Sequence, residues 1–389
     1  MFYHQSALGG APVGGGAAGD NGQVQARIAV LGATGSIGRQ AIEVAAAHRD
    51  RLRLVGLSCR TRAEACDALA RDERARVVVA ERDGDEAIID LSRADDVDLV
   101  VIGIPGIAAL RPTLAALDAG KAVAIAAKEV LVVGGHLVRA RVRRGAGERL
   151  RPIDSEHCAL WQCLRGEDLA TVESVTLTAS GGPFRDTPLE ALPGMSAERA
   201  LQHPTWQMGP KVTIDSATLV NKGYEVIEAH WLFDLPYSAV NAVIHPQSLV
   251  HALVRFADGS VKAQLADPDM RLPIQYALLY PERLESPARR LELHDLSFNP
   301  IDPARYPCYE IVLEAALQGA AATIAVNAAD EIAVERFLHG DLTFTAIAGV
   351  LDRALGIASR SSLGATPDLA TILGFDREVR RELAAKALA

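Results

Sequence analysis

Three acidic residues in two segments of the chain have the chemistry to bind a divalent cation. Asp154 and Glu156 lie two residues apart in the segment PIDSEH, so both carboxylates would point to the same side if the segment is extended. Glu225 offers a third carboxylate further along the chain. Ligands that are all oxygen favour a hard cation such as Mg²⁺ or Mn²⁺ over zinc. Taken alone, the segment 152–157 could instead be a solvated loop.

Two further segments carry groups that suit a phosphate. Ser216, Asn221 and Lys222 offer a hydroxyl, an amide and an ammonium. A helix after Ser216 would place Asn221 and Glu225 one turn apart on one face. The Ser-Gly-Gly turn at 180–182 can present backbone N–H groups and the Ser180 hydroxyl to an anion. The alternative for the first segment is a helix capped by Ser216 with incidental polar residues.

The loop at 201–210 contains a histidine, a tryptophan and a methionine between proline and glycine residues: His203, Trp206 and Met208. Such a loop could cover a ligand and exclude water. Core packing is the alternative for Trp206 and Met208. His245 and His251 lie in apolar, strand-like segments, and we interpret both as structural.

A glycine-rich turn follows the apolar run at 28–31. Gly32 and Gly35 allow the backbone to approach a pyrophosphate, Gly38 allows the next helix to pack on the strand, and that helix begins with free N–H groups. The segment therefore predicts a dinucleotide site. The next strand ends in SCRTR at 58–62, where Arg60 and Arg62 suit a ribose 2′-phosphate and favour NADPH. Solvated surface arginines are the alternative.

Apolar runs at 28–31, 52–57, 77–80, 98–103 and 122–127 alternate with helical segments, which predicts an α/β fold with a Rossmann-like, doubly wound parallel sheet at 27–150. Strand-like runs at 172–179, 211–214, 240–244 and 248–256 predict a central α+β catalytic domain at 151–281. A linker at 282–308 and a C-terminal helical bundle domain at 309–389 follow. Residues 1–26, rich in Gly and Ala, are expected to form a disordered tail rather than a signal peptide.

Composition excludes several classes of protein. With 389 residues and a net charge of −9, the chain has no basic face for nucleic acid. No apolar run approaches the roughly 20 residues of a membrane span. Five cysteines without a CxxC pair argue against a zinc site and suit free thiols in a reducing compartment. We therefore expect a soluble cytoplasmic protein with a small-molecule substrate.

The sequence resembles the 1-deoxy-D-xylulose 5-phosphate reductoisomerase family. The motifs GATGSIG, DSEH, ASGGPF, HPTWQMG, IDSATLVNKGYEVIEA, DPDMRLPI and RYPC occur in the order and spacing of that family. The resemblance implies a V-shaped, three-domain homodimer. It also implies conversion of the phosphosugar 1-deoxy-D-xylulose 5-phosphate to 2-C-methyl-D-erythritol 4-phosphate, in isoprenoid precursor synthesis, with NADPH and Mn²⁺ or Mg²⁺, Co²⁺ being an alternative.

The resemblance also assigns site residues, and we state them as expectations. The metal ligands are Asp154, Glu156 and Glu225. The substrate-binding residues are Ser155, Glu156, Ser180, His203, Trp206, Ser216, Asn221, Lys222 and Glu225. The cofactor-binding residues are Gly32, Thr34, Gly35, Ser36, Ile37, Gly38, Cys59, Arg60, Thr61, Ala127, Lys128, Glu129, Gly209 and Met270. The expected catalytic residues are Glu156, His157 and Lys128.

Three positions depart from the family pattern. Ala127 stands where Asn is usual, Cys59 where Gly is usual and Cys158 where a polar residue is commoner. None removes an expected ligand, so we expect an active enzyme with altered NADPH affinity. The rival interpretations are an NADP-dependent dehydrogenase that acts without rearrangement and a non-catalytic NADPH-sensing module.

Overall fold

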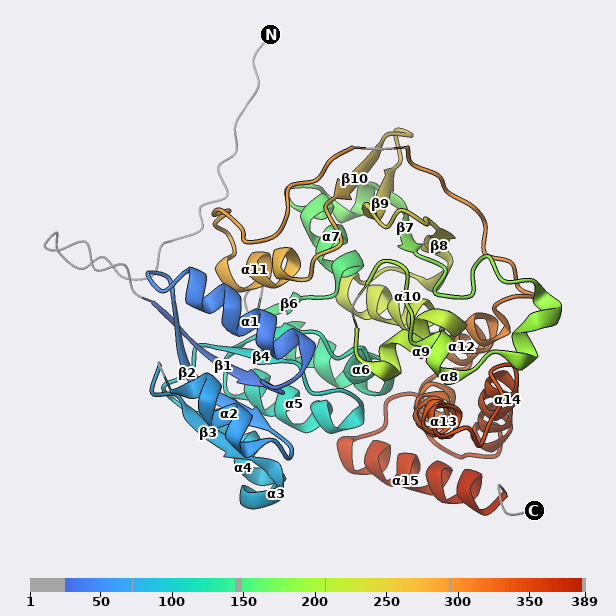
Figure 1. The fold of residues 1–389 in the computed structure, drawn as a ribbon, viewed down its shortest axis with the longest axis horizontal. Coiled ribbons are helices and arrows are strands. Elements are labelled where there is room, and N and C mark those ends of the chain that lie inside the picture. Colours follow the sequence, from blue (N-terminus) through green and yellow to red (C-terminus); the bar gives the residue numbers. More distant parts are fainter. Residues whose placement is uncertain (1–24, 72, 144–148, 207, 294, 387–389) are drawn as a thin grey trace, which may run out of the picture.

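The computed structural model describes residues 25–71, 73–143, 149–206, 208–293 and 295–386 (Figure 1). The expected tail at 1–26 lies outside the described residues except for its last two. Of these, Ala26 already begins the first strand. No helix among the described residues is long and apolar enough to cross a membrane.

The first sheet has six parallel strands in the order β3-β2-β1-β4-β5-β6. The strands are β1 (Ala26–Leu31), β2 (Leu52–Cys59), β3 (Arg76–Val79), β4 (Leu99–Ile102), β5 (Ala122–Ile125) and β6 (Leu150–Pro152). The expected parallel sheet is therefore confirmed. The boundary expected at 150 falls inside β6, which pairs with β5. Because β1 pairs with both β2 and β4, the winding direction reverses at β1, where such sheets bind ligands.

Helices cover both faces of this sheet. They are α1 (Ser36–Ala47), α2 (Ala63–Ala70), α3 (Ala80–Asp83), α4 (Asp85–Ser92), α5 (Leu110–Asp118), α6 (Lys128–Arg143) and, from later in the chain, α11 (Arg271–Leu279). One face packs Ile28 and Val30 against Val44 of α1 and Ile274 of α11. Helix α11 thus completes the first unit, although the sequence places it in the expected catalytic domain.

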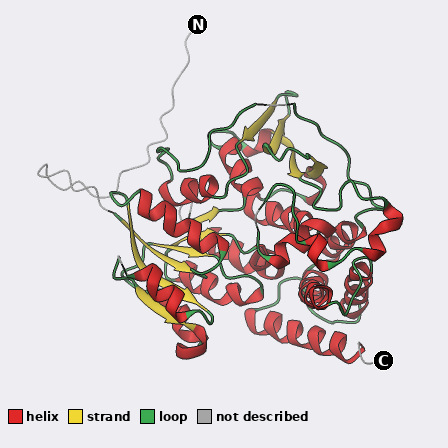
Figure 2. Cartoon of the chain, in the orientation of Figure 1, coloured by secondary structure: helices red, strands yellow, loops and turns green. Residues whose placement is uncertain are grey.

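The second sheet is smaller than the first (Figure 2). It is mixed, with the strand order β10-β9-β7-β8. Its strands are β7 (Val172–Ala179), β8 (Val240–Ile244), β9 (Val250–Phe256) and β10 (Val261–Leu265). Helices α7 (Ser155–Leu164) and α10 (Val220–Phe233) pack against it, and their apolar residues share one core with Val175 and Leu177. The catalytic side chains expected at 154–157 and 221–225 therefore start from helices that rest on the same sheet.

One local expectation for this region was wrong, and two interpretations that the sequence left open do not hold. Residues 211–214 form no strand, because Pro210 starts helix α9 (Pro210–Thr218) at its first position and Lys211 pairs with Asp215 one turn later. Ser216 is no N-cap, since it lies near the end of α9 and the left-handed Leu219 separates α9 from α10. The segment 152–157 is not extended throughout, because helix α7 begins at Ser155.

The C-terminal region is helical, as expected. It contains α12 (Pro307–Gln318), α13 (Ala320–His339), α14 (Ala346–Ala358) and α15 (Leu369–Lys386), and α13 packs against the other three as well as α6 and α9. The segment 282–306 before it contains neither helix nor strand in its described part, and Asn299 bridges to Ile244 of β8. A short α8 (Ala197–Ala200) and the 3₁₀ helices Ile107–Ala109, Leu169–Thr171, Leu189–Gly194 and Tyr237–Ala239 complete the chain.

Candidate active site

One cavity of about 160 Å³ joins the glycine-rich turn to the acidic residues. Its walls come from both sheets' helices and from the loop before α9. Most of the expected site residues line it: Ser36, Ile37, Lys128, Asp154, Ser155, Glu156, Ser180, Trp206, Met208, Gly209, Ser216, Asn221, Lys222, Glu225 and Met270.

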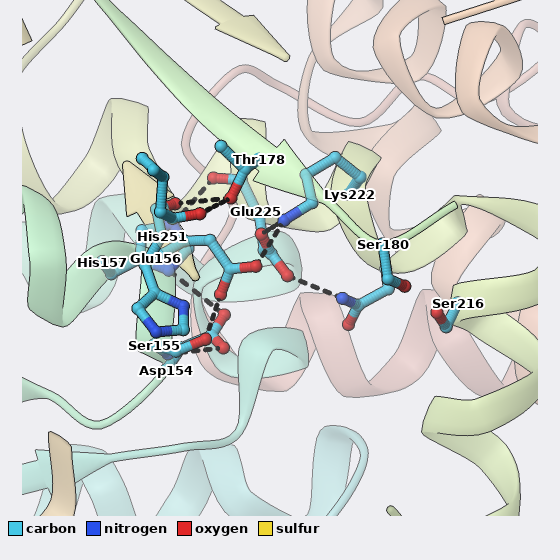
Figure 3. Close-up of polar contacts among 12 residues, drawn as sticks. Asp154, Ser155, Glu156, His157, Thr178, Ser180, Ser216, Lys222, Glu225 and His251 are labelled. Carbon is cyan, nitrogen blue, oxygen red and sulfur yellow. Dashed lines mark hydrogen bonds and ion pairs between the residues drawn. The ribbon is translucent and has the colours of Figure 1, made fainter. Parts of the chain in front are cut away.

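The three expected metal ligands converge at this cavity (Figure 3). Asp154 is the N-cap of α7 and accepts a hydrogen bond from the Ser155 backbone N–H, which fixes it beside Glu156 in the first turn. Glu225 approaches from α10, and one oxygen from each carboxylate lies within 4.8 Å of the others. Three converging carboxylates are a donor set that fits a hard divalent cation such as Mg²⁺ or Mn²⁺.

Two lysines share the oxygens of these carboxylates. Lys128 contacts Asp154 and lies 3.3 Å from Glu225, while Lys222 lies 2.7 Å from Glu156 and also contacts Glu225. Burial and then the charge of Glu156 raise the pKa of Glu225 to about 7. Burial also raises the pKa of Asp154, but Lys128 and His157 outweigh this effect and hold that pKa below its usual range. The three carboxylates repel one another, so they can lie this close together only when cations balance their charges.

His157 lies behind Asp154 and does not line the cavity. Its Nδ1 is 3.2 Å from Asp154 Oδ2 and 3.7 Å from Glu228, and its Nε2 is 2.9 Å from the Glu225 carbonyl oxygen. Burial lowers the pKa of His157, but Glu228 and Asp154 outweigh it and raise the pKa to about 9. His157 is thus placed to orient two of the expected metal ligands. Glu228 was not among the expected site residues. Its spacing of three residues from Glu225 on a helix could have indicated it, because residues three apart are neighbours on the helix surface.

The groups expected to bind phosphate divide into two sets. His203 Nε2 lies 3.0 Å from the Ser180 hydroxyl and 3.1 Å from the Ser216 hydroxyl, which brings these three together. Asn221 instead donates to Glu225 at 2.6 Å, and Lys222 faces the carboxylates as described above. We call Ser180, His203 and Ser216 the hydroxyl cluster; Figure 3 shows Ser180 and Ser216 to the right of the carboxylates.

The protonation state of His203 follows from its hydrogen bonds. Its Nδ1 accepts from the backbone N–H groups of Thr205 and Trp206, at 3.1 Å and 2.9 Å, so Nε2 carries the proton that faces the two serines. Burial and then the charge of Arg185 lower the pKa of His203 to about 4. His203 is therefore neutral near pH 7 and can donate one hydrogen bond toward an anion.

A second cavity, of about 410 Å³, lies at the carboxyl ends of β1, β2 and β4. Gly32 has φ +86°, and a Cβ there would lie 2.6 Å from the Gly103 carbonyl oxygen, so only glycine fits the turn. Helix α1 begins after Gly35 without a side-chain cap, which leaves its N–H groups available to a phosphate. Thr34, Cys59 and Arg60 also line this cavity.

The remaining expected cofactor residues are placed as follows. Gly38 packs under the turn, where a Cβ would lie 2.3 Å from the Gly32 carbonyl oxygen. Thr61 is exposed at the bend after β2, and Ala127 is buried before α6. Glu129 turns away from the cavity and lies 3.7 Å from Lys211.

A glycine-rich turn at the switch point of a parallel sheet, next to a cluster of three carboxylates, defines a class of protein: a dinucleotide-dependent enzyme with a divalent-metal site. The family model described as 1-deoxy-D-xylulose 5-phosphate reductoisomerase matches residues 28–84 and 80–135. Models for two C-terminal domains of the same reductoisomerase match residues 150–233 and 265–382.

Curated relatives point to the same family. The 1-deoxy-D-xylulose 5-phosphate reductoisomerase of Thermomicrobium roseum is 45% identical over 381 residues, covering 93% of this chain and 98% of the relative. That of Geobacillus kaustophilus is 45% identical over 375 residues, covering 91% and 97%. The chain belongs to the 1-deoxy-D-xylulose 5-phosphate reductoisomerase family, as the sequence motifs predicted.

Solved structures agree with the fold. A crystal structure of DOX-P reductoisomerase in complex with NADPH, fosmidomycin and magnesium has a TM-score of 0.87 and 37% identity, covering 93% of this chain and 98% of that one. The Zymomonas mobilis enzyme in complex with NADPH has a TM-score of 0.82 and 34% identity, covering 94% and 99%. The α/β fold with a helical C-terminal region is thereby confirmed.

Proposed function

We propose that this protein converts 1-deoxy-D-xylulose 5-phosphate to 2-C-methyl-D-erythritol 4-phosphate, by rearrangement and reduction with NADPH and a divalent metal. One observation carries the proposal: a single cavity is lined by Ser36 and Ile37 of the dinucleotide turn, by the three carboxylates and by Ser180 and Ser216 of the hydroxyl cluster. The complexes of the similar solved enzymes with NADPH and magnesium support the same assignment.

The carboxylates of Asp154, Glu156 and Glu225 would hold Mg²⁺, Mn²⁺ or Co²⁺, which supplies Lewis-acid stabilisation of negative charge on the substrate oxygens. Ser155 and Glu156 face the same cavity, where they can bind substrate hydroxyls, and Glu156 can hold a proton during the rearrangement. Lys128, at the junction of the two units, contacts Asp154 and orients it. His157 orients Asp154 and Glu225 from behind.

The hydroxyl cluster would bind the substrate phosphate, together with Asn221 and Lys222 when these turn from the carboxylates. Anchoring the phosphate at a distance orients the reacting carbons. Trp206 and Met208 would cover the substrate, and Met270 would border the nicotinamide that delivers hydride. Apolar walls of this kind exclude water from the reaction.

We assign the cofactor to the first unit, at 27–150 with the remainder of β6, and the metal and substrate to 151–281. We likewise assign 309–389 to a C-terminal helical domain and 282–308 to a linker before it; helix α12 begins at Pro307, just before the proposed end of that linker. The dinucleotide would follow Gly32, Thr34, Gly35, Ser36, Ile37 and Gly38, reach Cys59, Arg60 and Thr61 with its 2′-phosphate, and pass Ala127, Lys128, Glu129 and Gly209.

We also propose that the protein is a cytoplasmic homodimer. Strand β10 lies at the edge of the second sheet with its backbone open to a partner on one side, and Val261 on it is 46% exposed. Leu293 and Phe298 of the segment after α11 are exposed as well. Free, buried cysteines fit a reducing compartment. Sedimentation of a Val261→Lys variant tests the dimer, which should dissociate if β10 forms the interface.

The function is tested by mixing the protein with 1-deoxy-D-xylulose 5-phosphate, NADPH and Mn²⁺ and following NADPH oxidation, with and without a chelator. We expect oxidation that the chelator stops, and a methylerythritol phosphate product. The Glu225→Gln variant should lose turnover and keep NADPH binding. No oxidation would favour the NADPH-sensing interpretation, and oxidation that ignores the chelator would favour an ordinary dehydrogenase.

A further inference from the structure

A second group of charges lies directly behind the wall of the site cavity. Lys211 Nζ is 2.7 Å from Asp215 Oδ2, 2.5 Å from Asp330 Oδ2 and 3.7 Å from Glu129 Oε1. The Asp215 and Asp330 side chains are 4% and 0% exposed. We call these four residues the Lys211 cluster.

Members of the Lys211 cluster are chain neighbours of residues that line the cavity. Glu129 follows Lys128 on α6, and Asp215 precedes Ser216 on α9. Successive residues of a helix point about 100° apart, so one side chain of each pair faces the cavity and the other faces the cluster. A change in the cluster can therefore reach the cavity through the first turn of α6 and through α9.

Asp330 connects the cluster to the C-terminal helices. It lies on α13, which packs against α6 and α9 (Figure 1). The cavity has no lining residue from α12 to α15 among the described residues. The C-terminal region therefore reaches the walls of this cavity from behind, although Leu373 of α15 lines the second cavity directly. The contact of Asp330 with Lys211, the second residue of α9, is one place where it reaches the first cavity.

The cluster depends on charge. One ammonium faces three carboxylates, and the Oδ1 atoms of Asp215 and Asp330 are buried without a hydrogen-bond partner. Buried carboxylates that share a single cation hold it firmly, because each uncompensated charge would be costly in this environment. Replacing Asp330 by the isosteric Asn weakens that hold without leaving a hole in the packing.

We propose that Lys211 and Asp330 are positioning residues for the substrate-phosphate site: the C-terminal helices hold α9 at Lys211, and α9 sets the Ser216 hydroxyl against His203. The identity of the substrate rests on the function proposed above. If α9 is held less firmly, a smaller fraction of molecules has a competent hydroxyl cluster, and the apparent affinity for the phosphosugar falls by that fraction. The bound substrate still reacts at the same carboxylates, so kcat changes little. Most of the proposed NADPH contacts lie at the turn after β1, and only Glu129 of the cluster and Gly209 at the start of α9 are also expected to contact the cofactor, so NADPH should bind nearly as before.

The test compares Asp330→Asn with Asp376→Asn. Asp376 is a matched control because it is also a buried aspartate of the C-terminal helices, paired with Arg380 at 2.8 Å. For Asp330→Asn we expect the KM for the phosphosugar to rise on the order of tenfold at nearly constant kcat and NADPH affinity. Amide hydrogen exchange at 211–218 should be faster in that variant alone. Unchanged KM and exchange, or equal effects in Asp376→Asn, would overturn the proposal.

A double-variant comparison tests whether the two residues act through each other. Lys211→Arg keeps the charge and should keep the KM, whereas Lys211→Met should raise it. Adding Asp330→Asn to Lys211→Met should cause no further rise, since the pair is already broken; independent, additive effects would contradict the proposal. If the wild type oxidises no NADPH, the proposed function fails, while the exchange measurement still decides whether Asp330 positions α9.

Discussion

The ammonium of Lys222 lies 2.7 Å from the carboxylate of Glu156, inside the group of side chains expected to bind metal. Lys222 is 2% exposed and also contacts Glu225. Because a divalent cation would use the same oxygens, Lys222 and the cation repel each other at short range. Metal binding and the orientation of Lys222 are therefore linked.

Replacing Lys222 by Gln should raise the affinity for Mn²⁺ several-fold, since the competing cation is removed, and should raise the KM for the phosphosugar. Electron paramagnetic resonance of free Mn²⁺ measures the first effect. Lys262→Gln is the control, because Lys262 is exposed and forms its ion pair with Glu167, away from the carboxylates of the site. Weaker Mn²⁺ binding would mean that Lys222 assembles the carboxylates instead of competing for them.

Replacing Glu228 by Gln should lower Mn²⁺ affinity by roughly 10- to 100-fold, the usual effect of removing a group that orients a metal ligand. Glu228 lies 3.7 Å from His157 Nδ1, and His157 in turn lies 3.2 Å from Asp154. Calorimetric titration with Mn²⁺ in the absence of NADPH measures the change. The control is Glu335→Gln, at an exposed position of α13, and this variant should bind Mn²⁺ as the wild type does. Wild-type Mn²⁺ affinity in Glu228→Gln would mean that Glu228 does not orient the metal ligands.

Replacing Arg60 by Asp should weaken NADPH binding by roughly 10- to 100-fold, because a hydrogen bond to a charged group contributes about 1.5–3 kcal/mol. NADH binding should change less. Arg60 lines the second cavity and Arg62 does not, so Arg62→Asp is the matched control. Cofactor fluorescence gives both dissociation constants. An equal loss in the two variants would refute the assignment of Arg60 to the 2′-phosphate.

The low pKa of His203, about 4 against an ordinary 6.5, predicts a pH-dependent stability. The folded state resists protonation of His203. In the unfolded chain, the same histidine takes up a proton as the pH falls through its ordinary pKa of 6.5. His203 thus contributes stability above that value and loses it as the pH falls toward 4. Urea unfolding at about pH 7.5 and about pH 5.5 should show a smaller acid-induced loss in His203→Gln than in the wild type. The exposed His339→Gln should behave as the wild type, and identical losses in all three would contradict the prediction.

Much of the first unit was predictable from the sequence. The apolar runs that form β1 to β5 are local and hydrophobic on both faces, and such runs form parallel strands wherever helices can cover them. The turn at 32–38 was equally predictable, because Gly32 must adopt a positive φ. The types of the metal and phosphate ligands also follow from the sequence, since oxygen chemistry belongs to the residues themselves.

Other features depended on contacts between distant segments. The run at 211–214 has the composition of a strand, yet Pro210 and the packing around it make a helix, so local propensity was overruled. Helix α11 packs beside α1 more than two hundred residues earlier in the chain, as the 227-residue separation of the bonded His48 and Gln275 shows. Spacing alone reveals none of these pairings.

The sequence by itself therefore determined which chemistry is available: a dinucleotide turn, three carboxylates and polar groups for a phosphate. Only the tertiary structure decided which of these groups meet. It placed His203 with Ser180 and Ser216, turned Lys222 toward Glu156, and set Asp330 behind the wall of the cavity. The physical reason is that side-chain type is a local property, whereas burial and charge pairing arise only when helices far apart in the chain pack together.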